Sequence, residues 1–465
     1  MKINSFKAQK VHGYLNYDIE FFPELTFLIG INGSGKTSAL KLILGLISPS
    51  YHYLNQIDFE FAELVCSSKD NEKDITIRAE QKPKERAFNL SLKSPKGNYE
   101  PVEFPRFVRP EDDNFDIEEV SIKEQNYKEQ FDSLEITRAI REFATPKFLG
   151  LDRKIYEGRT IDMRFRNRRN IYNYPKNRRK YEGYQGATAI DSSLDDVQQL
   201  IFEYYRVIAY QQPKISEEFK RKIFQLSFNF IDDYNLEQIP EDTTKIADKK
   251  DKVLKAIQNL DIGYLDYNVN NFFQQMERIV EQNKVYNEQK ENKEEIKGIS
   301  EEQFKVLRKW FNNSSQLRRI DEIINFSQTY QEKIAELRAP IKRLEKITSN
   351  FLREGKKQIQ IAEDGEIKVK LSNGKLANVF ELSSGEKQII IMIAHLIFEE
   401  DQKPSGVFII DEPELSLHIA WQEIFVNSIT EASPKTQFIL ATHSPSIISK
   451  VNREKFCQDL NKLNY

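Results

Sequence analysis

The sequence is poor in cysteine and has no long hydrophobic run. Two of its 465 residues are cysteines, Cys66 and Cys457, and neither belongs to a C-x-x-C pair or stands beside a histidine cluster. The pattern therefore predicts neither a disulfide framework nor a zinc site. The longest apolar run, Ile389–Phe398, is interrupted by His395 and is too short to span a bilayer, and Met1–Lys10 contain no apolar signal segment. These features favour a soluble cytoplasmic protein with no membrane partner.

A strong net charge is also missing. The sequence has 69 lysine and arginine residues against 72 aspartate and glutamate residues, which gives a formal net charge of −3. Such a balance provides no overall attraction to nucleic acid, so any nucleic-acid contact has to be local. The length allows two or three domains.

A glycine-rich motif, Gly30-Ile31-Asn32-Gly33-Ser34-Gly35-Lys36-Thr37, fits the phosphate-binding pattern G-x-x-x-x-G-K-[ST]. Its glycines let backbone N–H groups approach phosphates, and Lys36 supplies a positive charge to the β and γ oxygens. The run Leu25–Ile29 predicts a buried strand before the motif, and Ser38–Ile47 predicts a helix whose N-terminus faces the phosphates. A glycine-rich turn without a ligand is the alternative. The predicted nucleotide-binding residues are Gly30, Asn32, Gly33, Ser34, Gly35, Lys36, Thr37 and Ser38.

Two acids follow a second buried strand. In Val407–Pro413, four apolar residues predict a central parallel strand, and Asp411 and Glu412 stand at its end. We expect Asp411 to hold Mg²⁺ together with the Thr37 hydroxyl, and Glu412 to polarise the attacking water. An Asp-Glu pair after a strand is common by chance, but a phosphate-binding loop in the same chain makes chance a poor explanation.

Further motifs carry a resemblance to ABC-type ATPases. Leu382–Gln388, with the sequence Leu-Ser-Ser-Gly-Glu-Lys-Gln, resembles their signature motif. Asp411–His418 resembles their Walker B motif and D-loop, with His418 where an aspartate is usual, and Thr442–Pro445 resembles their switch histidine. The resemblance implies an α/β fold: a P-loop ATPase head with a mixed sheet and an antiparallel lobe, into which a compact helical arm is inserted.

The same resemblance implies a mechanism. ATP and Mg²⁺ would be the cofactors, and Glu412 and His443 the catalytic residues of ATP hydrolysis. ATP held by Lys36 of one subunit would be closed over by the signature of another, so that the functional unit is at least a dimer. The signature residues are Ser383, Ser384, Gly385 and Glu386. Two plainer interpretations are that Ser383 and Ser384 only cap a helix and that His443 is structural.

The pattern predicts a head interrupted by an insertion. We expect the N-terminal half of the head over 1–154, a basic loop over 155–189, a helical insertion over 190–352 and the C-terminal half of the head over 353–465. Period-two alternation predicts an antiparallel lobe from three strands, 57–61, 74–77 and 88–92.

Local signals refine the second half of this scheme. Ser300–Gln303 fit a capping box, and Pro213 and Pro340 are expected to divide the helical run. Residues 358–371 alternate again and predict a hairpin, with turns at Asp364-Gly365 and Asn373-Gly374.

One segment, Met163–Tyr181, is basic and contains three tyrosines but no acid. A contact that follows a nucleic-acid backbone is one interpretation. A solvated loop, or a docking surface for an acidic partner, is another. The candidate contact residues are Arg164, Arg166, Arg168, Arg169, Arg178 and Arg179.

The architecture narrows the resemblance to the SMC- and OLD-like part of the superfamily. OLD nucleases carry a Toprim domain after the switch histidine, whereas here 22 residues follow His443, which are too few for such a domain. We therefore expect no intrinsic nuclease. A head and arm of this kind are similar to the PtuA-type ATPases of Septu antiphage systems and of some retrons. That resemblance implies a PtuB-like HNH nuclease as partner and, in a retron, a reverse transcriptase with small DNA.

Two other functions remain open. A RecF-like ATPase of DNA repair or recombination would bind DNA in an ATP-dependent way. The ATP-binding subunit of a transporter is the third interpretation, although transporter subunits normally have closer Walker A and signature motifs and no helical arm.

Overall fold

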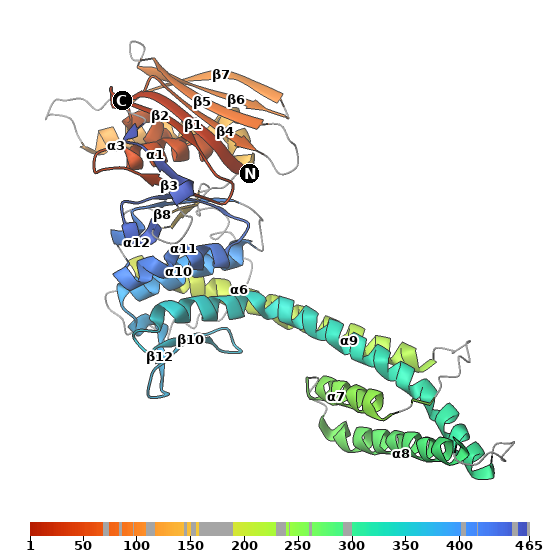
Figure 1. The fold of residues 1–465 in the computed structure, drawn as a ribbon. Coiled ribbons are helices and arrows are strands. Elements are labelled where there is room, and N and C mark those ends of the chain that lie inside the picture. Colours follow the sequence, from red (N-terminus) through yellow and green to blue (C-terminus); the bar gives the residue numbers. More distant parts are fainter. Residues whose placement is uncertain are drawn as a thin grey trace. The chain divides into compact units, whose positions relative to one another are not determined.

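The computed structural model describes residues 1–67, 74–82, 86–95, 97–107, 117–143, 147–149, 155–157, 189–228, 239–240, 242–259, 263–291, 300–400, 406–415, 417–448 and 454–462 (Figure 1). The chain divides into two compact units. The first, which we call the head, consists of Met1–Phe202 and Arg343–Tyr465. The second, which we call the arm, consists of Glu203–Lys342. The pattern predicted an insertion over 190–352.

An antiparallel sheet of 6 strands forms one layer of the head, in the order β2-β1-β4-β5-β6-β7. Its strands are β1 Lys2–Val11, β2 Leu15–Glu20, β4 Phe61–Ser67, β5 Asp74–Lys82, β6 Ala87–Ser94 and β7 Gly97–Pro105. Every second residue of β2 and β4 is buried, as the period-two pattern requires. The predicted antiparallel lobe is therefore confirmed.

The first of the three strands predicted for this lobe, 57–61, starts later than predicted. The pattern pointed to a strand from Ile57, but β4 begins at Phe61. The Gln81 side chain binds this backbone instead: Phe59 N donates to Gln81 Oε1 at 3.0 Å, and Gln81 Nε2 donates to Ile57 O at 2.7 Å. A side-chain amide thus takes the hydrogen bonds that a neighbouring strand would otherwise make.

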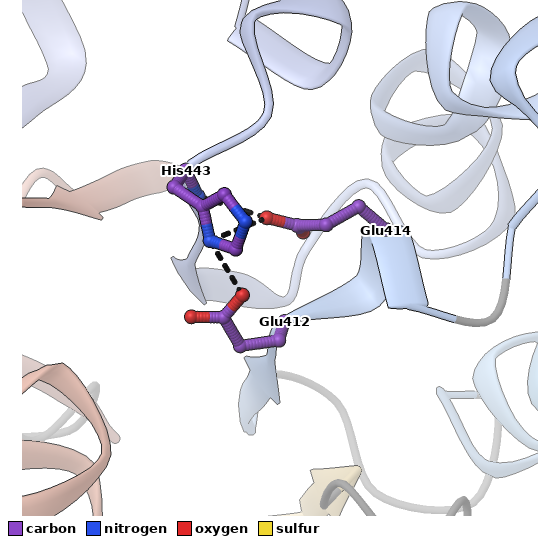
Figure 2. Close-up of side chains that lie close together, drawn as sticks. All are labelled: Glu412, Glu414 and His443. Carbon is purple, nitrogen blue, oxygen red and sulfur yellow. Dashed lines mark hydrogen bonds and ion pairs between the residues drawn. The ribbon is translucent and has the colours of Figure 1, made fainter. Parts of the chain in front are cut away.

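The second large sheet has 6 strands in the order β15-β3-β14-β13-β8-β9. They are β3 Leu25–Ile29, β8 Lys147–Leu149, β9 Ile155–Glu157, β13 Val407–Asp411, β14 Gln437–Ala441 and β15 Cys457–Asp459. The sheet is mixed, because β9 alone pairs antiparallel. Asp411 pairs with Ala441, and Ala441 with Leu28, so the carboxyl ends of β13, β14 and β3 are level. The segments that follow these strands meet at this edge, where Glu412 and His443 point toward each other (Figure 2).

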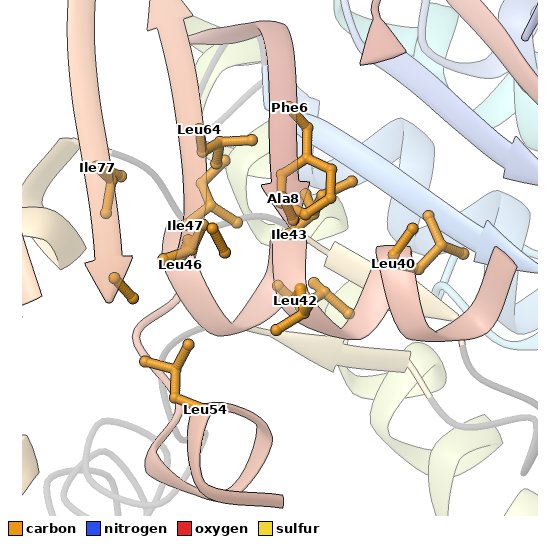
Figure 3. Close-up of a cluster of buried hydrophobic side chains, with 14 of the residues drawn as sticks. Phe6, Ala8, Leu40, Leu42, Ile43, Leu46, Ile47, Leu54, Leu64 and Ile77 are labelled. Carbon is orange, nitrogen blue, oxygen red and sulfur yellow. The ribbon is translucent and has the colours of Figure 1, made fainter. Parts of the chain in front are cut away.

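The helix α1 Lys36–Ile47 packs against both sheets, with contacts to β4 and β5 and to β13 and β14. Its sequence is apolar nearly all round, as expected of a helix buried on every side. Figure 3 shows Ile43 and Ile47 of α1 near Phe6 and Leu64 of the antiparallel sheet. This core fixes the start of α1 beside the end of β3.

Other helices described in the head are α2 Tyr51–Gln56, α3 Ile117–Ser133, α4 Glu135–Phe143, α10 Ser384–Glu400, α11 Ile419–Ala432 and α12 Pro445–Ile448. A small antiparallel sheet precedes α10 and consists of β10 Gln358–Ile361, β11 Ile367–Lys370 and β12 Leu376–Asn378. Gly365 and Gly374 adopt positive φ angles of 86° and 78° in its turns. The predicted hairpin is confirmed and gains a third strand.

The arm is helical in its described residues. Its helices are α6 Ala189–Phe228, α7 Thr244–Asn259, α8 Asp266–Glu291 and α9 Glu301–Leu352, and the unit boundaries fall inside α6 and α9. Phe273, Met276 and Trp310 are buried in its core. The Ser300 hydroxyl accepts a hydrogen bond from Gln303 N at 3.1 Å, which is one half of the predicted capping box. No described helix has the length and the apolar character that crossing a bilayer requires.

The prediction that two prolines divide the helical run is wrong. Pro213 lies inside α6 and Pro340 inside α9. Each removes one backbone donor, yet α6 and α9 hold each other beside both positions. Arg338 donates to the Gln212 side chain at 3.1 Å, and the Tyr204 hydroxyl donates to Leu337 O at 2.9 Å. These tertiary contacts keep both helices continuous.

Together, the mixed sheet, the antiparallel lobe and the helical insertion confirm the predicted fold class, an α/β ABC-type P-loop head with an inserted arm.

Candidate nucleotide and magnesium site

The phosphate-binding loop joins β3 to α1, as the sequence predicted. Gly33 and Gly35 have φ angles of +87° and +84°, which favour glycine. A Cβ atom on Gly35 would lie 2.1 Å from the Tyr17 hydroxyl, and one on Gly30 would lie 2.4 Å from Ser34 Oγ. Gly35 is the N-cap of α1 and offers no side-chain cap, so the first N–H groups of the helix need another acceptor. A phosphate suits this position.

Lys36 is nearly buried, with 5% of its side chain exposed. Its ammonium nitrogen donates to Gly30 O at 3.0 Å and to Ile31 O at 3.4 Å, and it lies 3.7 Å from Glu412 Oε1. The positive charge therefore sits between the loop carbonyl groups and the end of β13. An incoming phosphate would replace carbonyl oxygens with charged ones, which are stronger acceptors.

Thr37 and Asp411 are adjacent, although they are far apart in the sequence. The Thr37 hydroxyl donates to Asp411 Oδ2 at 2.9 Å. Within the described part of the chain, Asp411 Oδ1 and Ser34 Oγ are buried without a hydrogen-bond partner. Burial raises the pKa of the Asp411 carboxyl group, and the Thr37 hydroxyl, Lys41 and Lys36 oppose that rise. A carboxylate with a free oxygen beside a hydroxyl fits Mg²⁺, which prefers hard oxygen ligands and shares them with substrate phosphates.

The side chains of Glu412 and His443 lie in close contact, and Glu412 also lies near Lys36. His443 Nδ1 lies 2.7 Å from Glu412 Oε2 and 3.4 Å from Glu414 Oε1 (Figure 2). Burial raises the pKa of Glu412, and the negative charge of Glu414 raises it further, while His443 and Lys36 lower it. Glu412 has a φ angle of +48°, an uncommon conformation for a residue with a side chain. The carboxylate is thus held at the edge where the γ-phosphate and a water molecule would lie.

The signature residues Ser383–Glu386 stand at the start of α10 and form a capping box. The Ser383 hydroxyl and backbone N donate to Glu386 Oε2 at 2.8 and 2.9 Å, and Glu386 N donates to Ser383 Oγ at 3.4 Å. Lys357 adds an ion pair with Glu386 at 2.8 Å. Burial alone would raise the pKa of Glu386, but the Lys357 and Ser383 donors outweigh it and hold that pKa below its usual value. Ser383 therefore caps α10, as one of the two plainer interpretations predicted. The hydrogen bonds of this cap do not involve Ser384 or Gly385, so both residues remain available for other contacts.

Two further predicted nucleotide-binding residues, Asn32 and Ser38, also lie at the loop. Asn32 is exposed, and the Ser38 hydroxyl lies 3.0 Å from His12 Nε2. The candidate contact residues of the basic segment lie outside the described residues: Arg164, Arg166, Arg168, Arg169, Arg178 and Arg179.

Sequence reasoning assigned no role to three residues that contact the site. The Tyr17 hydroxyl donates to Gly35 O at 3.0 Å, and Asn461 Oδ1 accepts a hydrogen bond from Ile31 N at 3.2 Å. Glu414 binds the segment that carries His443. Tyr17 and Asn461 belong to no local motif, and the only signal for Glu414 is its position two residues after Glu412.

These features define a class of protein, the P-loop ATPases. The family model described as "AAA ATPase domain" matches residues 1–448, and the chain belongs to this family.

Curated relatives match over a smaller part of the chain. The Retron Vc95 probable ATPase of Vibrio cholerae serotype O1 biovar El Tor is 33% identical over 104 residues, which cover 20% of this chain and 20% of that protein. Septu protein PtuA of Bacillus thuringiensis is 38% identical over 95 residues, or 18% of this chain and 24% of that protein. The Retron Ec83 probable ATPase of Escherichia coli is 31% identical over 91 residues, covering 18% and 17%. The matches thus span about a fifth of these relatives, and over that part they confirm the predicted resemblance.

Solved structures of Smc head domains are also similar. One from Pyrococcus furiosus, with an extended coiled coil and bound to the C-terminal domain of ScpA, covers 96% of this chain and is itself covered to 91%, with a TM-score of 0.35 and 15% identity. A similarity at this score supports no conclusion about function.

Proposed function

We propose that this chain binds and hydrolyses ATP as a subunit of an antiphage defence complex, dimerises through its heads and regulates a separately encoded HNH nuclease. The observation that carries the ATPase activity is the meeting of Lys36, the Thr37–Asp411 pair and the Glu412–His443 pair at one sheet edge. Family membership supports the same activity. The partial similarity to retron ATPases and to Septu protein PtuA supports the role in defence.

ATP binding would begin with a change of partner at Lys36. The ammonium group would leave the carbonyl oxygens of Gly30 and Ile31 for the β- and γ-phosphate oxygens, while the N–H groups at the start of α1 bind phosphate. Thr37 and Asp411 would hold Mg²⁺, which when bound neutralises phosphate charge.

Hydrolysis would then depend on Glu412. Its carboxylate would orient the attacking water and take up its proton, and His443, already 2.7 Å away, would keep the carboxylate in place and contact the γ-phosphate. ATP would favour a closed pair of heads if Ser383–Glu386 of a second subunit also contact that phosphate. Loss of the phosphate would remove this link, so hydrolysis could change the state of a bound nuclease.

The ATPase proposal is tested with Glu412→Gln. This variant should bind ATP as the unchanged chain does, while its turnover should fall by about 10²-fold or more, since it loses the proton acceptor. Glu423→Gln, an exposed carboxylate on α11, is the matched control and should retain turnover. Undiminished hydrolysis in Glu412→Gln would contradict the assignment.

The partners are tested by mild affinity purification of the chain expressed with its native neighbouring genes. An HNH nuclease in a stable ratio would support the proposal, and a reverse transcriptase with small DNA would indicate a retron. DNA bound to the ATPase alone would favour the RecF-like function instead. Sedimentation of the Glu412→Gln variant with and without ATP tests whether the heads pair.

A further inference from the structure

The Glu414 carboxylate is the centre of a hydrogen-bond network at the end of β14. The Thr442 hydroxyl lies 2.8 Å from each of its oxygens, His443 N donates to Oε1 at 2.8 Å, and Ser444 N donates to the same oxygen at 3.1 Å. Only 8% of the Glu414 side chain is exposed. Hydrogen bonds to a buried carboxylate are about twice as strong as those between neutral groups. The Glu414 side chain therefore binds three consecutive residues, Thr442, His443 and Ser444.

The network leaves His443 few positions to adopt. Ser444 is held from its other side, because its hydroxyl donates to Gln422 Oε1 at 2.6 Å while Gln422 Nε2 donates to Leu417 O at 3.0 Å. Glu412 N also donates to Ala441 O at 2.9 Å, which ties the end of β13 to the end of β14. The 2.7 Å contact between His443 and Glu412 is thus built on a backbone that is fixed on both sides.

We propose that Glu414 is a positioning residue, which presents His443 to Glu412 and so sets the geometry for water activation. The proposal rests on the proposed ATPase function. The hydrogen bonds of the carboxylate favour a positioning role over direct contact with ATP or water. Donors from Thr442, His443 and Ser444 already occupy its oxygens. Because Glu412, Glu414 and His443 lie close enough to share a cation, a charge-dependent role of Glu414 is the competing explanation.

Two substitutions at this position separate the explanations. Glutamine can keep the network, because its oxygen can accept from His443 N and Ser444 N while its NH₂ group donates to the Thr442 hydroxyl oxygen. Alanine removes every one of these bonds. We expect Glu414→Ala to lower kcat by about 10²-fold, the loss that a misplacement of about 1 Å can cause. Its KM and its affinity for ATP should stay within about twofold, and Glu414→Gln should retain most of kcat.

Two further measurements distinguish a local change around His443 from a loss of folding. Circular dichroism and ATP affinity show whether each variant is folded at the site. Amide hydrogen exchange at His443 and Ser444 should speed up in Glu414→Ala and stay slow in Glu414→Gln, and this measurement does not require turnover.

Each result has a definite meaning. Equal losses of kcat in Glu414→Ala and Glu414→Gln would overturn the proposal, because they would show that the charge of Glu414 is what matters. An unchanged kcat in Glu414→Ala would also overturn it. Absence of hydrolysis by the unsubstituted chain, which is measured first, would instead refute the ATPase function on which the proposal rests.

Discussion

The contact between Tyr17 and Gly35 allows a quantitative prediction about how substitutions in the phosphate-binding loop change the stability of the head. Gly33 and Gly35 have nearly the same backbone conformation, with φ angles of +87° and +84°, but their surroundings differ. Apart from its chain neighbours, an added Cβ on Gly33 meets no atom of the described residues within 4 Å, whereas one on Gly35 meets the Tyr17 hydroxyl at 2.1 Å and Leu15 Cδ1 at 2.7 Å. Gly33→Ala is therefore a matched control for Gly35→Ala.

The two substitutions share one cost and differ in another. Alanine in the left-handed conformation costs about 1–2 kcal/mol at either position. At Gly35 the buried Tyr17 side chain also has to move, which breaks its bond to Gly35 O at about 0.5–1.5 kcal/mol and strains the packing by about 1–3 kcal/mol. Gly35→Ala should therefore destabilise the head by about 1.5–4.5 kcal/mol more than Gly33→Ala.

Tryptophan fluorescence can follow this difference, because the chain has 2 tryptophans, Trp310 in the arm and Trp421 in the head. In a Trp310→Phe background, urea unfolding without nucleotide reports on the head. Tyr17→Phe removes the hydroxyl oxygen and should recover about 1–2 kcal/mol of the cost of Gly35→Ala in the double variant. Equal costs at Gly33 and Gly35, or strictly additive effects with Tyr17→Phe, would refute the idea that the Tyr17 hydroxyl shapes the loop.

Other predictions concern magnesium, the signature helix and the basic segment. Asp411→Asn should raise the Mg²⁺ concentration for half-maximal ATP hydrolysis by about tenfold or more, because a charged ligand is lost, and an unchanged value would exclude Asp411 as a ligand. Ser383→Ala should lower the unfolding free energy of the head by about 1 kcal/mol, measured by Trp421 fluorescence, and a cost no larger than that of Ser384→Ala would argue against the cap. In the basic segment, replacement of Arg166, Arg168 and Arg169 with glutamate should weaken nucleic-acid binding and reduce its salt dependence. Unchanged binding would show that this segment does not contact nucleic acid.

Sequence patterns predicted the elements that depend on neighbouring residues. The strand Leu25–Ile29, the helix after the loop and the turns of the small sheet were foreseen, since each follows from local periodicity or from glycine conformation. The prolines show the limit of local reasoning. Pro213 and Pro340 each disfavour a continuous helix locally, but contacts between α6 and α9, which are distant in sequence, outweigh this effect.

The sequence by itself determined the class of chemistry, because the phosphate-binding loop is a contiguous motif whose glycines and lysine act through their own backbone and charge. Only the tertiary structure decided how the candidate site is held. Tyr17 supports Gly35, Asn461 binds Ile31, and Glu414 fixes the segment around His443, each across a long sequence separation. The contacts of Asn461 and Glu414 arise because parallel strands align their carboxyl ends, whereas Tyr17 reaches the loop from β2 of the antiparallel sheet. The strand order that brings these segments together is a property of the whole head.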